Sequence, residues 1–230
     1  VYTPLGLAGQ SWSPDSRWLA YARGAAGSPR FTAIWLYDSD TGRTHQVTSG
    51  AYNDSWPTFD SSGRYLYFVS ARRFLSPRFD SVDYNNFIYS STDVLLIVSL
   101  RGDIGAPWAP PAGQAQPSAD RGIELAGFEH RALIALRDNG KYGNLIAGRD
   151  GRLFFAFTPD DGAPAVKMLS LAEGREAKTV LAGVTDFRLS ADGKRLLVRQ
   201  GDNLAVADAV PDQKVDRHID LAGMTVDVDP

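Results

Sequence analysis

The sequence predicts an all-β fold made of repeated four-stranded antiparallel units. Glycine and proline account for 22 and 13 of the 230 residues, which is typical of a chain with many turns and short strands. A pattern of apolar strand, polar turn and apolar strand recurs four times, with turns at Ser16, Gly63, Gly151 and Gly193. Two of the three intervals match the roughly 40–50 residues of a propeller blade. We therefore expect a β-propeller with about four blades.

The first unit is expected at about residues 8–50. Its hairpin turn contains Pro14, which fixes φ, and Asp15, whose carboxylate can accept hydrogen bonds from nearby backbone amides. A third strand is expected at 34–37 and a fourth at 44–48. A hairpin followed by a third strand, a polar turn and a fourth strand is the order of an antiparallel blade.

The second unit, at about 51–136, is longer than the others. Its third strand is expected at 94–100 and its fourth within 122–136. Two insertions account for the additional length, one at about 71–92 and one at about 101–121. The second insertion is rich in proline, alanine and glycine, a composition typical of a flexible connection. No additional blade is needed to explain the spacing.

The third and fourth units are expected at about 143–183 and 184–228. Gly151 and Gly193 supply the positive φ that their tight turns require. A β-sandwich also contains many short strands and polar turns, but it does not require each unit to repeat the same order of strands and turns. The repeat therefore favours a propeller. The remaining strands are expected at 166–171, 177–181, 204–207 and 215–221.

Composition and motifs exclude several classes of function. The net charge of −3 gives no basic surface for nucleic acid, and no apolar stretch approaches the roughly 18–20 residues that span a membrane. The chain has no cysteine, and His45, His130 and His218 lack metal-ligand spacing. No nucleophile elbow or nucleotide-binding loop occurs. We expect no catalytic residue, metal or cofactor in this chain.

Candidate binding residues follow from the topology of a blade. The connections from second to third strand, and from one blade to the next, share one face of a propeller. The insertion at 71–92 lies on that face and carries basic and aromatic side chains suited to peptide backbone, carboxylates and apolar groups. Aromatic residues in long loops also pack onto their own scaffold, and both interpretations stay open. The candidate residues are Arg72, Arg73, Arg78, Phe79, Tyr84 and Phe87.

Two acidic residues stand where innermost strands begin. Asp54 and Asp186 are expected near the mouth of a central channel. Their carboxylates can contact ligand amines or hydrogen-bond local backbone amides, and the second role is common for Asp at turns. The large aromatic residues Trp12, Trp18, Trp35 and Trp56 are expected in the core, because such side chains fill the contacts between blades.

Several motifs carry a resemblance to a known family. Trp12-Ser13-Pro14-Asp15 and Ile34-Trp35-Leu36-Tyr37-Asp38 are similar to a repeat shared by tricorn, TolB and prolyl-oligopeptidase propellers. Asp54-Ser55-Trp56-Pro57-Thr58-Phe59-Asp60 and Ile123-Glu124-Leu125-Ala126-Gly127-Phe128-Glu129-His130-Arg131 are more specific. In that order, they resemble the C-terminal part of the second, seven-bladed propeller of tricorn protease and its bacterial homologues. The resemblance implies about three further blades beyond this chain.

The resemblance also implies a function. It implies that the chain is a noncatalytic propeller segment of a serine peptidase, which is a hydrolase. This segment would scaffold the peptidase and filter peptides or guide them to a catalytic region outside the chain. The implied partners are peptides or unfolded polypeptide and the remaining domains of a homo-oligomeric, cytoplasmic or periplasmic parent. The alternatives are a TolB-like or WD40-like protein-interaction propeller without a peptidase, and a self-contained hydrolase on a small propeller. Because an open arc leaves terminal sheets exposed, we expect the chain to be one piece of a larger particle.

Overall fold

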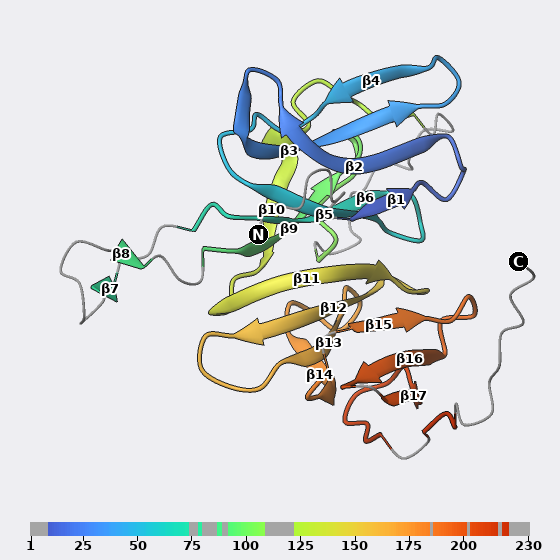
Figure 1. Ribbon diagram of the computed structural model, residues 1–230. Helices are drawn as coiled ribbons and strands as arrows, with labels where there is room; N and C mark the ends of the chain where they lie inside the picture. The colour runs from blue at the N-terminus through green and yellow to red at the C-terminus, as the bar shows by residue number, and fades with distance from the viewer. Residues whose placement is uncertain are drawn as a thin grey trace, which may run out of the picture.

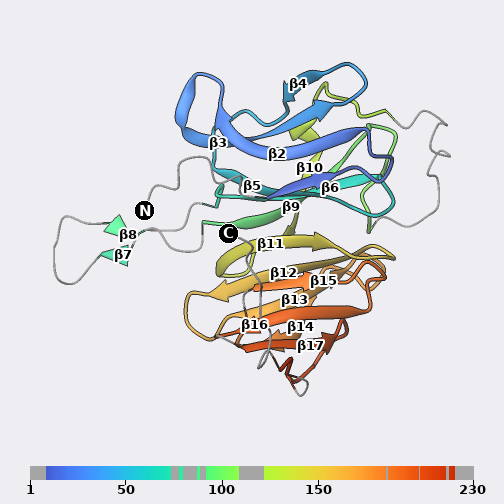
Figure 2. The same ribbon diagram turned by 45° about the vertical axis from the view of Figure 1, so that its right-hand side comes forward.

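The computed structural model describes residues 9–73, 78–79, 87–88, 92–108, 122–184, 186–201, 203–215 and 218–220. Antiparallel strands form four successive sheets, stacked in chain order (Figures 1 and 2). The described residues contain no α-helix, and their one 3-10 helix, η1 (Glu129–Arg131), is short. No helix in this part of the chain is long and apolar enough to cross a membrane. The predicted all-β propeller architecture is therefore confirmed.

Blade 1 is a four-stranded sheet in which each strand pairs with the next. Its first turn is held by Ser13, whose Oγ accepts a hydrogen bond from the Trp18 backbone N–H at 2.8 Å and donates one to Asp15 at 2.5 Å. Ser16 takes φ 61° in this turn, where the other long turns have glycine. The strands are β1 (Gln10–Trp12), β2 (Trp18–Ala25), β3 (Ser28–Asp38) and β4 (Arg43–Gln46).

Blade 2 has the strand order β10-β9-β6-β5. Its second and third strands are not consecutive in number, because the first insertion lies between them in the chain. Beyond the pair Ser70–Val94, the Arg73 N–H donates to the Thr92 carbonyl at 2.9 Å. The insertion also contains a separate hairpin, which stands away from the four sheets in both ribbon views (Figures 1 and 2). The strands are β5 (Asp54–Phe59), β6 (Tyr65–Ser70), β9 (Val94–Ser99) and β10 (Ala132–Leu136), with β7 (Arg78–Phe79) and β8 (Phe87–Ile88) in the hairpin.

Blade 3 repeats the order of blade 1 with a shorter first turn. Asp150 and Gly151 both have positive φ, 57° and 68°, which is the backbone geometry of a type I′ hairpin. The other three blades instead close the turn with a single left-handed residue. The strands are β11 (Gly140–Ala147), β12 (Arg152–Pro159), β13 (Ala165–Ser170) and β14 (Ala177–Ala182).

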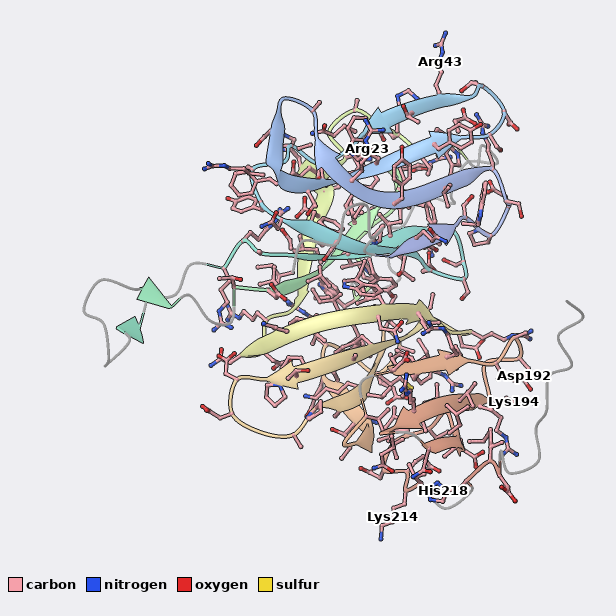
Figure 3. The ribbon with its side chains drawn as sticks, in the orientation of Figure 1. Arg23, Arg43, Asp192, Lys194, Lys214 and His218 are labelled. Atoms are coloured by element: carbon pink, nitrogen blue, oxygen red, sulfur yellow. The ribbon has the colours of Figure 1, made fainter. Side chains whose placement is uncertain are left out.

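Blade 4 has three strands, β15 (Asp186–Leu189), β16 (Arg195–Gln200) and β17 (Asn203–Asp208). Its first turn carries Asp192 and Lys194, labelled in Figure 3, and the Lys194 N–H donates to the Asp192 carboxylate at 3.0 Å. Of the fourth strand expected at 215–221, the structure shows one bridge, from Ala205 to His218. Residues 216, 217 and 221 lie outside the described part of the chain.

The core lies between consecutive blades. In β6, Leu66 and Phe68 face blade 1, whereas Tyr65, Tyr67 and Val69 face blade 3. This alternation follows from the two-residue period of a strand. Because blade 2 has a neighbour on both sides, every residue of β6 is buried. Three apolar clusters join the four blades, and among their largest members are Trp18 and Phe68, Tyr67 and Phe155, and Phe154 and Phe187.

The expectation that four tryptophans lie in the core is right for Trp18 and Trp35 and wrong for Trp12. Trp12 is 52% exposed, whereas Phe59, its counterpart at the end of the next inner strand, is 3% exposed. Phe59 is covered by blade 1. Among the described residues, no sheet covers the corresponding side of blade 1, so the same strand position is open to solvent at Trp12. Trp56 is partly buried against the cluster between blades 2 and 3.

Candidate functional site

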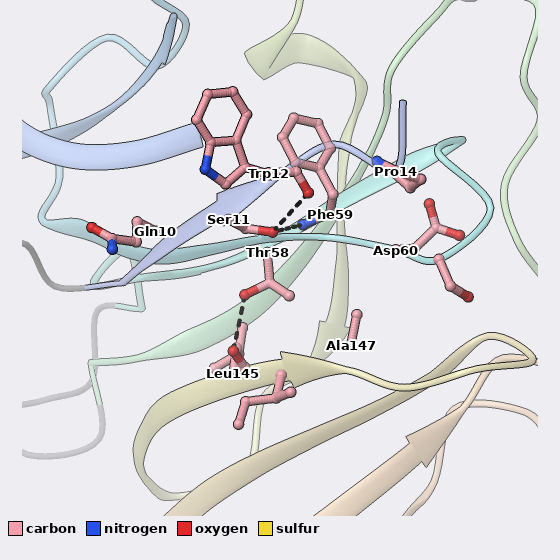
Figure 4. Close-up of a pocket in the computed structure, with 11 residues that line it drawn as sticks. Gln10, Ser11, Trp12, Pro14, Thr58, Phe59, Asp60, Leu145 and Ala147 are labelled. Atoms are coloured by element: carbon pink, nitrogen blue, oxygen red, sulfur yellow. Dashed lines mark hydrogen bonds between the residues drawn. The ribbon is translucent and has the colours of Figure 1, made fainter. Parts of the chain in front are cut away.

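The first strands of blades 1, 2 and 3 converge on a hollow of about 340 Å³ (Figure 4). These strands, β1, β5 and β11, contact one another in series and form the inner wall of the arc. We call this feature the inner-wall hollow. It is lined by Gln10, Ser11, Trp12, Pro14, Thr58, Phe59, Asp60, Ser61, Leu145, Ile146 and Ala147.

One side chain from each inner strand holds the next blade in place. Ser11 Oγ accepts a hydrogen bond from the Phe59 N–H at 3.1 Å, and Thr58 Oγ donates one to the Leu145 carbonyl at 3.1 Å (Figure 4). Further along, the Asn144 side-chain amide donates to the carbonyl of Phe187 in β15 at 3.1 Å. Each bond satisfies a backbone group that the blade's own sheet leaves unpaired. The wall is therefore tied together strand by strand.

The acid beside the hollow has a structural role. Asp60 is buried, and its carboxylate accepts hydrogen bonds from the backbone N–H groups of Arg64 and Tyr65 at 2.9 and 2.8 Å. A carboxylate held in this way stabilises the turn between β5 and β6. The lining offers an exposed indole at Trp12, aliphatic side chains on β11 and the polar Gln10. Such a surface can hold a ligand by apolar contact and hydrogen bonds.

Asp54, predicted near a channel mouth, is fully buried. Its Oδ1 accepts a hydrogen bond from Ser70 Oγ at 2.5 Å and lies 3.4 Å from the Arg72 guanidinium. Burial raises the pKa of the Asp54 carboxyl, while Ser70 and Arg72 act in the opposite direction. The carboxylate therefore contacts protein groups rather than solvent.

Arg72, predicted as a peptide contact, is paired within the fold. Its guanidinium lies 3.1 Å from Glu129 and 4.9 Å from the ring centroid of Tyr52. Glu129 in turn accepts the backbone N–H of Ser49 at 2.6 Å. We call Asp54, Ser70, Arg72 and Glu129 the Arg72 cluster. The cluster links three parts of the chain: the connection that leaves blade 1, the start of β5, and the beginning of the insertion at 71–92.

The other predicted residues are dispersed. The Arg73 guanidinium donates to the Arg137 carbonyl at 2.7 Å, beside blade 2. Asp186 is exposed at the start of β15, 3.2 Å from Arg188. Arg78, Phe79 and Phe87 belong to the β7–β8 hairpin, and Tyr84 lies outside the described residues. Of the predicted set, the structure thus brings Asp54 and Arg72 together.

The inner-wall hollow was missed from the sequence. Its signal is the alignment of the inner strands, which places Ser11 beside Trp12 and Thr58 beside Phe59 at matching positions before the turn. In the part of the chain that the structure describes, no group of three or more His, Asp or Glu residues could hold a metal ion.

Known proteins share both the sequence and the arrangement of the strands. A family model described as the tricorn protease second beta propeller domain matches residues 6–210. The tricorn protease homolog of Saccharolobus solfataricus is 26% identical over 205 residues, which are 86% of this chain and 18% of that protein. The tricorn protease of Thermoplasma volcanium is 21% identical over 227 residues, 93% of this chain and 22% of that protein. The chain spans about a fifth of these relatives' length.

Solved structures show the same fold. A crystal structure of the tricorn protease superposes with a TM-score of 0.74 at 22% identity, covering 88% of this chain and 21% of that chain. Prolyl oligopeptidase B from Galerina marginata superposes with a TM-score of 0.54 at 11% identity, covering 95% of this chain and 27% of that chain. The family match extends over most of the sequence and confirms the resemblance carried by its motifs. The chain belongs to the family of tricorn protease second β-propeller domains.

Proposed function

We propose that this chain is a noncatalytic propeller segment of a tricorn-like serine peptidase, and that it guides extended polypeptide along its inner wall. The observation that carries the proposal is the inner-wall hollow, built by three consecutive inner strands of a domain that belongs to a peptidase family. Concave surfaces with apolar walls and a few polar groups are the usual binding sites of proteins. Hydrolysis belongs to a region outside this chain.

The lining of the hollow suits a polypeptide of varied sequence. Trp12 offers an exposed, rigid aromatic surface, and the partly exposed Ile146 offers an aliphatic contact. Gln10 can donate to and accept from a peptide amide. No charged side chain of the lining is free for a salt bridge, because Asp60 is occupied by the turn. Recognition of this kind favours peptide backbone and apolar side chains over charge.

The β7–β8 hairpin supports a second contact, with the remaining domains of the parent protein. The hairpin stands away from the sheets (Figure 2), and its insertion carries Arg78, Phe79, Tyr84 and Phe87. Aromatic and basic residues are frequent anchors of protein interfaces. We place peptides or unfolded polypeptide at the inner wall and partner domains at the hairpin, in a homo-oligomeric parent that is cytoplasmic or, alternatively, periplasmic.

The test is binding without turnover. A fluorescently labelled, reduced and carboxymethylated polypeptide is titrated with the purified chain, and hydrolysis of the same probe is followed in parallel. We expect saturable binding that weakens in Trp12→Ser and is unchanged in Leu197→Ser, which alters an exposed apolar residue on β16 away from the hollow. Hydrolysis that an active-site serine reagent titrates would contradict the proposal. Binding only of folded proteins would favour an interaction module without a peptidase.

A further inference from the structure

The inner strand of blade 2 contains a residue in an unusual conformation. Trp56 has φ 54°, at the point where the register of β5 and β6 shifts between Ser55 and Thr58. Residues other than glycine and asparagine seldom adopt the left-handed region, and a bulky residue in this region is an outlier. Outliers of this kind persist where a function or the surrounding structure requires them. The cause has to be sought in the indole or in the backbone.

The backbone does not require tryptophan. In blades 1, 2 and 3, a left-handed residue lies three positions before the last residue of the inner strand. These residues are Gly9, just before β1, Trp56 in β5 and Asn144 in β11, with φ of 85°, 54° and 48°. Glycine and asparagine accept this conformation readily. Asn144 lies at a register shift as Trp56 does, between Gly143 and Ile146. Asparagine would therefore meet the local requirement at Trp56 as well.

The flanking blades leave room for the indole. A Cβ on Gly9 would come within 2.7 Å of the Trp56 Cα, and a Cβ on Gly143 would lie 3.4 Å from Trp56 Nε1. Backbone from blade 1 and backbone from blade 3 thus border this one side chain. Glycine at such a position permits a close approach that any other residue would obstruct.

The indole is only partly buried in this setting. It packs against the apolar cluster between blades 2 and 3. The buried indole nitrogens of Trp18 and Trp35 lack a hydrogen-bond partner, whereas that of Trp56 does not belong to this group of buried, unpartnered atoms. Trp56 is two residues before Thr58, which lines the inner-wall hollow. A partly exposed aromatic side chain therefore lies on the wall next to the hollow.

We propose that Trp56 is a contact platform for apolar and aromatic side chains of an extended polypeptide on the inner wall. This role of Trp56 rests on the proposed function. It specifies the preferred substrate class of the inner wall, which is polypeptide segments with exposed apolar side chains. The indole contributes apolar contact area and ring stacking, and its N–H donates to a carbonyl of the bound polypeptide. Trp56 is a specificity-determining residue and takes no part in bond cleavage.

The experiment replaces Trp56 with the residue that blade 3 uses at the same position. The full chain is titrated with two labelled peptides of equal length, one with phenylalanine at every third position of a Gly-Ser sequence and one with serine there. Wild type is expected to bind the phenylalanine peptide more tightly. In Trp56→Asn, we expect about a tenfold loss for that peptide, in line with truncation of an aromatic anchor, and little change for the serine peptide. Trp56→Phe should retain most of the preference.

A stability measurement separates this role from packing. Because asparagine accepts a left-handed backbone and the indole is only partly buried, the proposal expects Trp56→Asn to fold with a melting temperature close to that of the wild type. If wild type prefers the phenylalanine peptide and Trp56→Asn keeps the preference, the platform is refuted while the proposed function stands. A lower melting temperature with equal losses for both peptides would assign Trp56 to packing and also refute the platform. If wild type binds neither peptide, the proposed function fails, and the platform with it.

Discussion

The second strands of blades 2 and 4 occupy the same place in their sheets but have different surroundings. All six residues of β6, Tyr65–Ser70, are buried. In β16, Leu196 and Val198 are fully buried, whereas Leu197 between them is 40% exposed. Blade 2 has a sheet on each side, and blade 4 has one described neighbour, blade 3. Burial of a propeller strand is thus set by the blades around it as much as by its own apolar pattern.

The junctions between blades differ in the same way. Blades 1 and 2 share an apolar cluster, and the Arg72 cluster of blade 2, in which three ionisable groups lie close together, binds the connection between the two blades through the Ser49 N–H. Blades 3 and 4 are joined by an apolar cluster and by the hydrogen bond of Asn144. Buried charges stabilise only while they remain paired. The first junction should therefore depend on charge and pH, and the second on packing.

The largest effect is expected from a cavity at the junction of blades 1 and 2. Phe68 is fully buried, and Phe68→Ala removes its ring from the cluster. We expect a loss of about 3–5 kcal/mol in the free energy of unfolding, because lost burial and a residual cavity add. Urea unfolding followed by circular dichroism measures it. A loss below about 1 kcal/mol would mean that blade 1 does not pack there in solution.

Two neighbouring leucines of β16 differ in burial and should differ in their contribution to stability. Leu196→Ala should lower the free energy of unfolding by about 2–4 kcal/mol, because Leu196 is enclosed between blades 3 and 4. Leu197→Ala, the matched change one residue on, should cost less than about 1 kcal/mol. Equal losses would show that the outer face of blade 4 is covered, and light scattering would then detect association of the chain.

Charge pairing at the first junction is tested with Arg72→Met, which keeps most of the aliphatic side chain. The change leaves Asp54 and Glu129 without their cation, and we expect a loss of about 1–3 kcal/mol in the free energy of unfolding. Arg195→Met is the control, since Arg195 and Asp208 are half exposed at 3.0 Å and such pairs contribute about 0–1 kcal/mol. If both variants lose the same amount, the Arg72 cluster has no special role.

The smallest effects are expected from pH, and they should have opposite signs at two aspartates. Burial raises the pKa of Asp54, whereas the Arg17 guanidinium lowers the pKa of Asp38 to about 2. Asp54 therefore favours folding most below its ordinary pKa, and this contribution declines as pH rises through the raised value. Asp38 favours folding above its ordinary pKa, and this contribution is lost as pH falls toward 2.

Urea unfolding of Asp54→Asn and Asp38→Asn between pH 2 and 7 measures both contributions. As the pH falls, the wild type should gain stability relative to Asp54→Asn and lose stability relative to Asp38→Asn. Parallel pH profiles for the two variants would contradict the assignment of burial as the dominant influence on Asp54.

Much of the fold follows from local chemistry and was predictable. The turns at Ser16, Gly63 and Gly193 lie where the repeat indicated, because positive φ and short polar side chains specify a reversal within a few residues. The shorter turn at Asp150 and Gly151 was not distinguished, since its apolar flanks look the same. The inner-wall hollow was not predicted, and neither was the pairing of Asp54 with Arg72, because both depend on groups far apart in the chain.

The sequence by itself determined the repeat, the order of strands in each blade and the family, because turn residues and alternating apolar positions act over short distances. Only the tertiary structure decided which equivalent residues are buried. Phe59 and Trp12 end matching strands, and the neighbouring blade covers Phe59 while Trp12 stays open. The left-handed Trp56 between Gly9 and Gly143 likewise depends on three blades meeting. Contacts across blades join residues distant in sequence, and no local pattern specifies them.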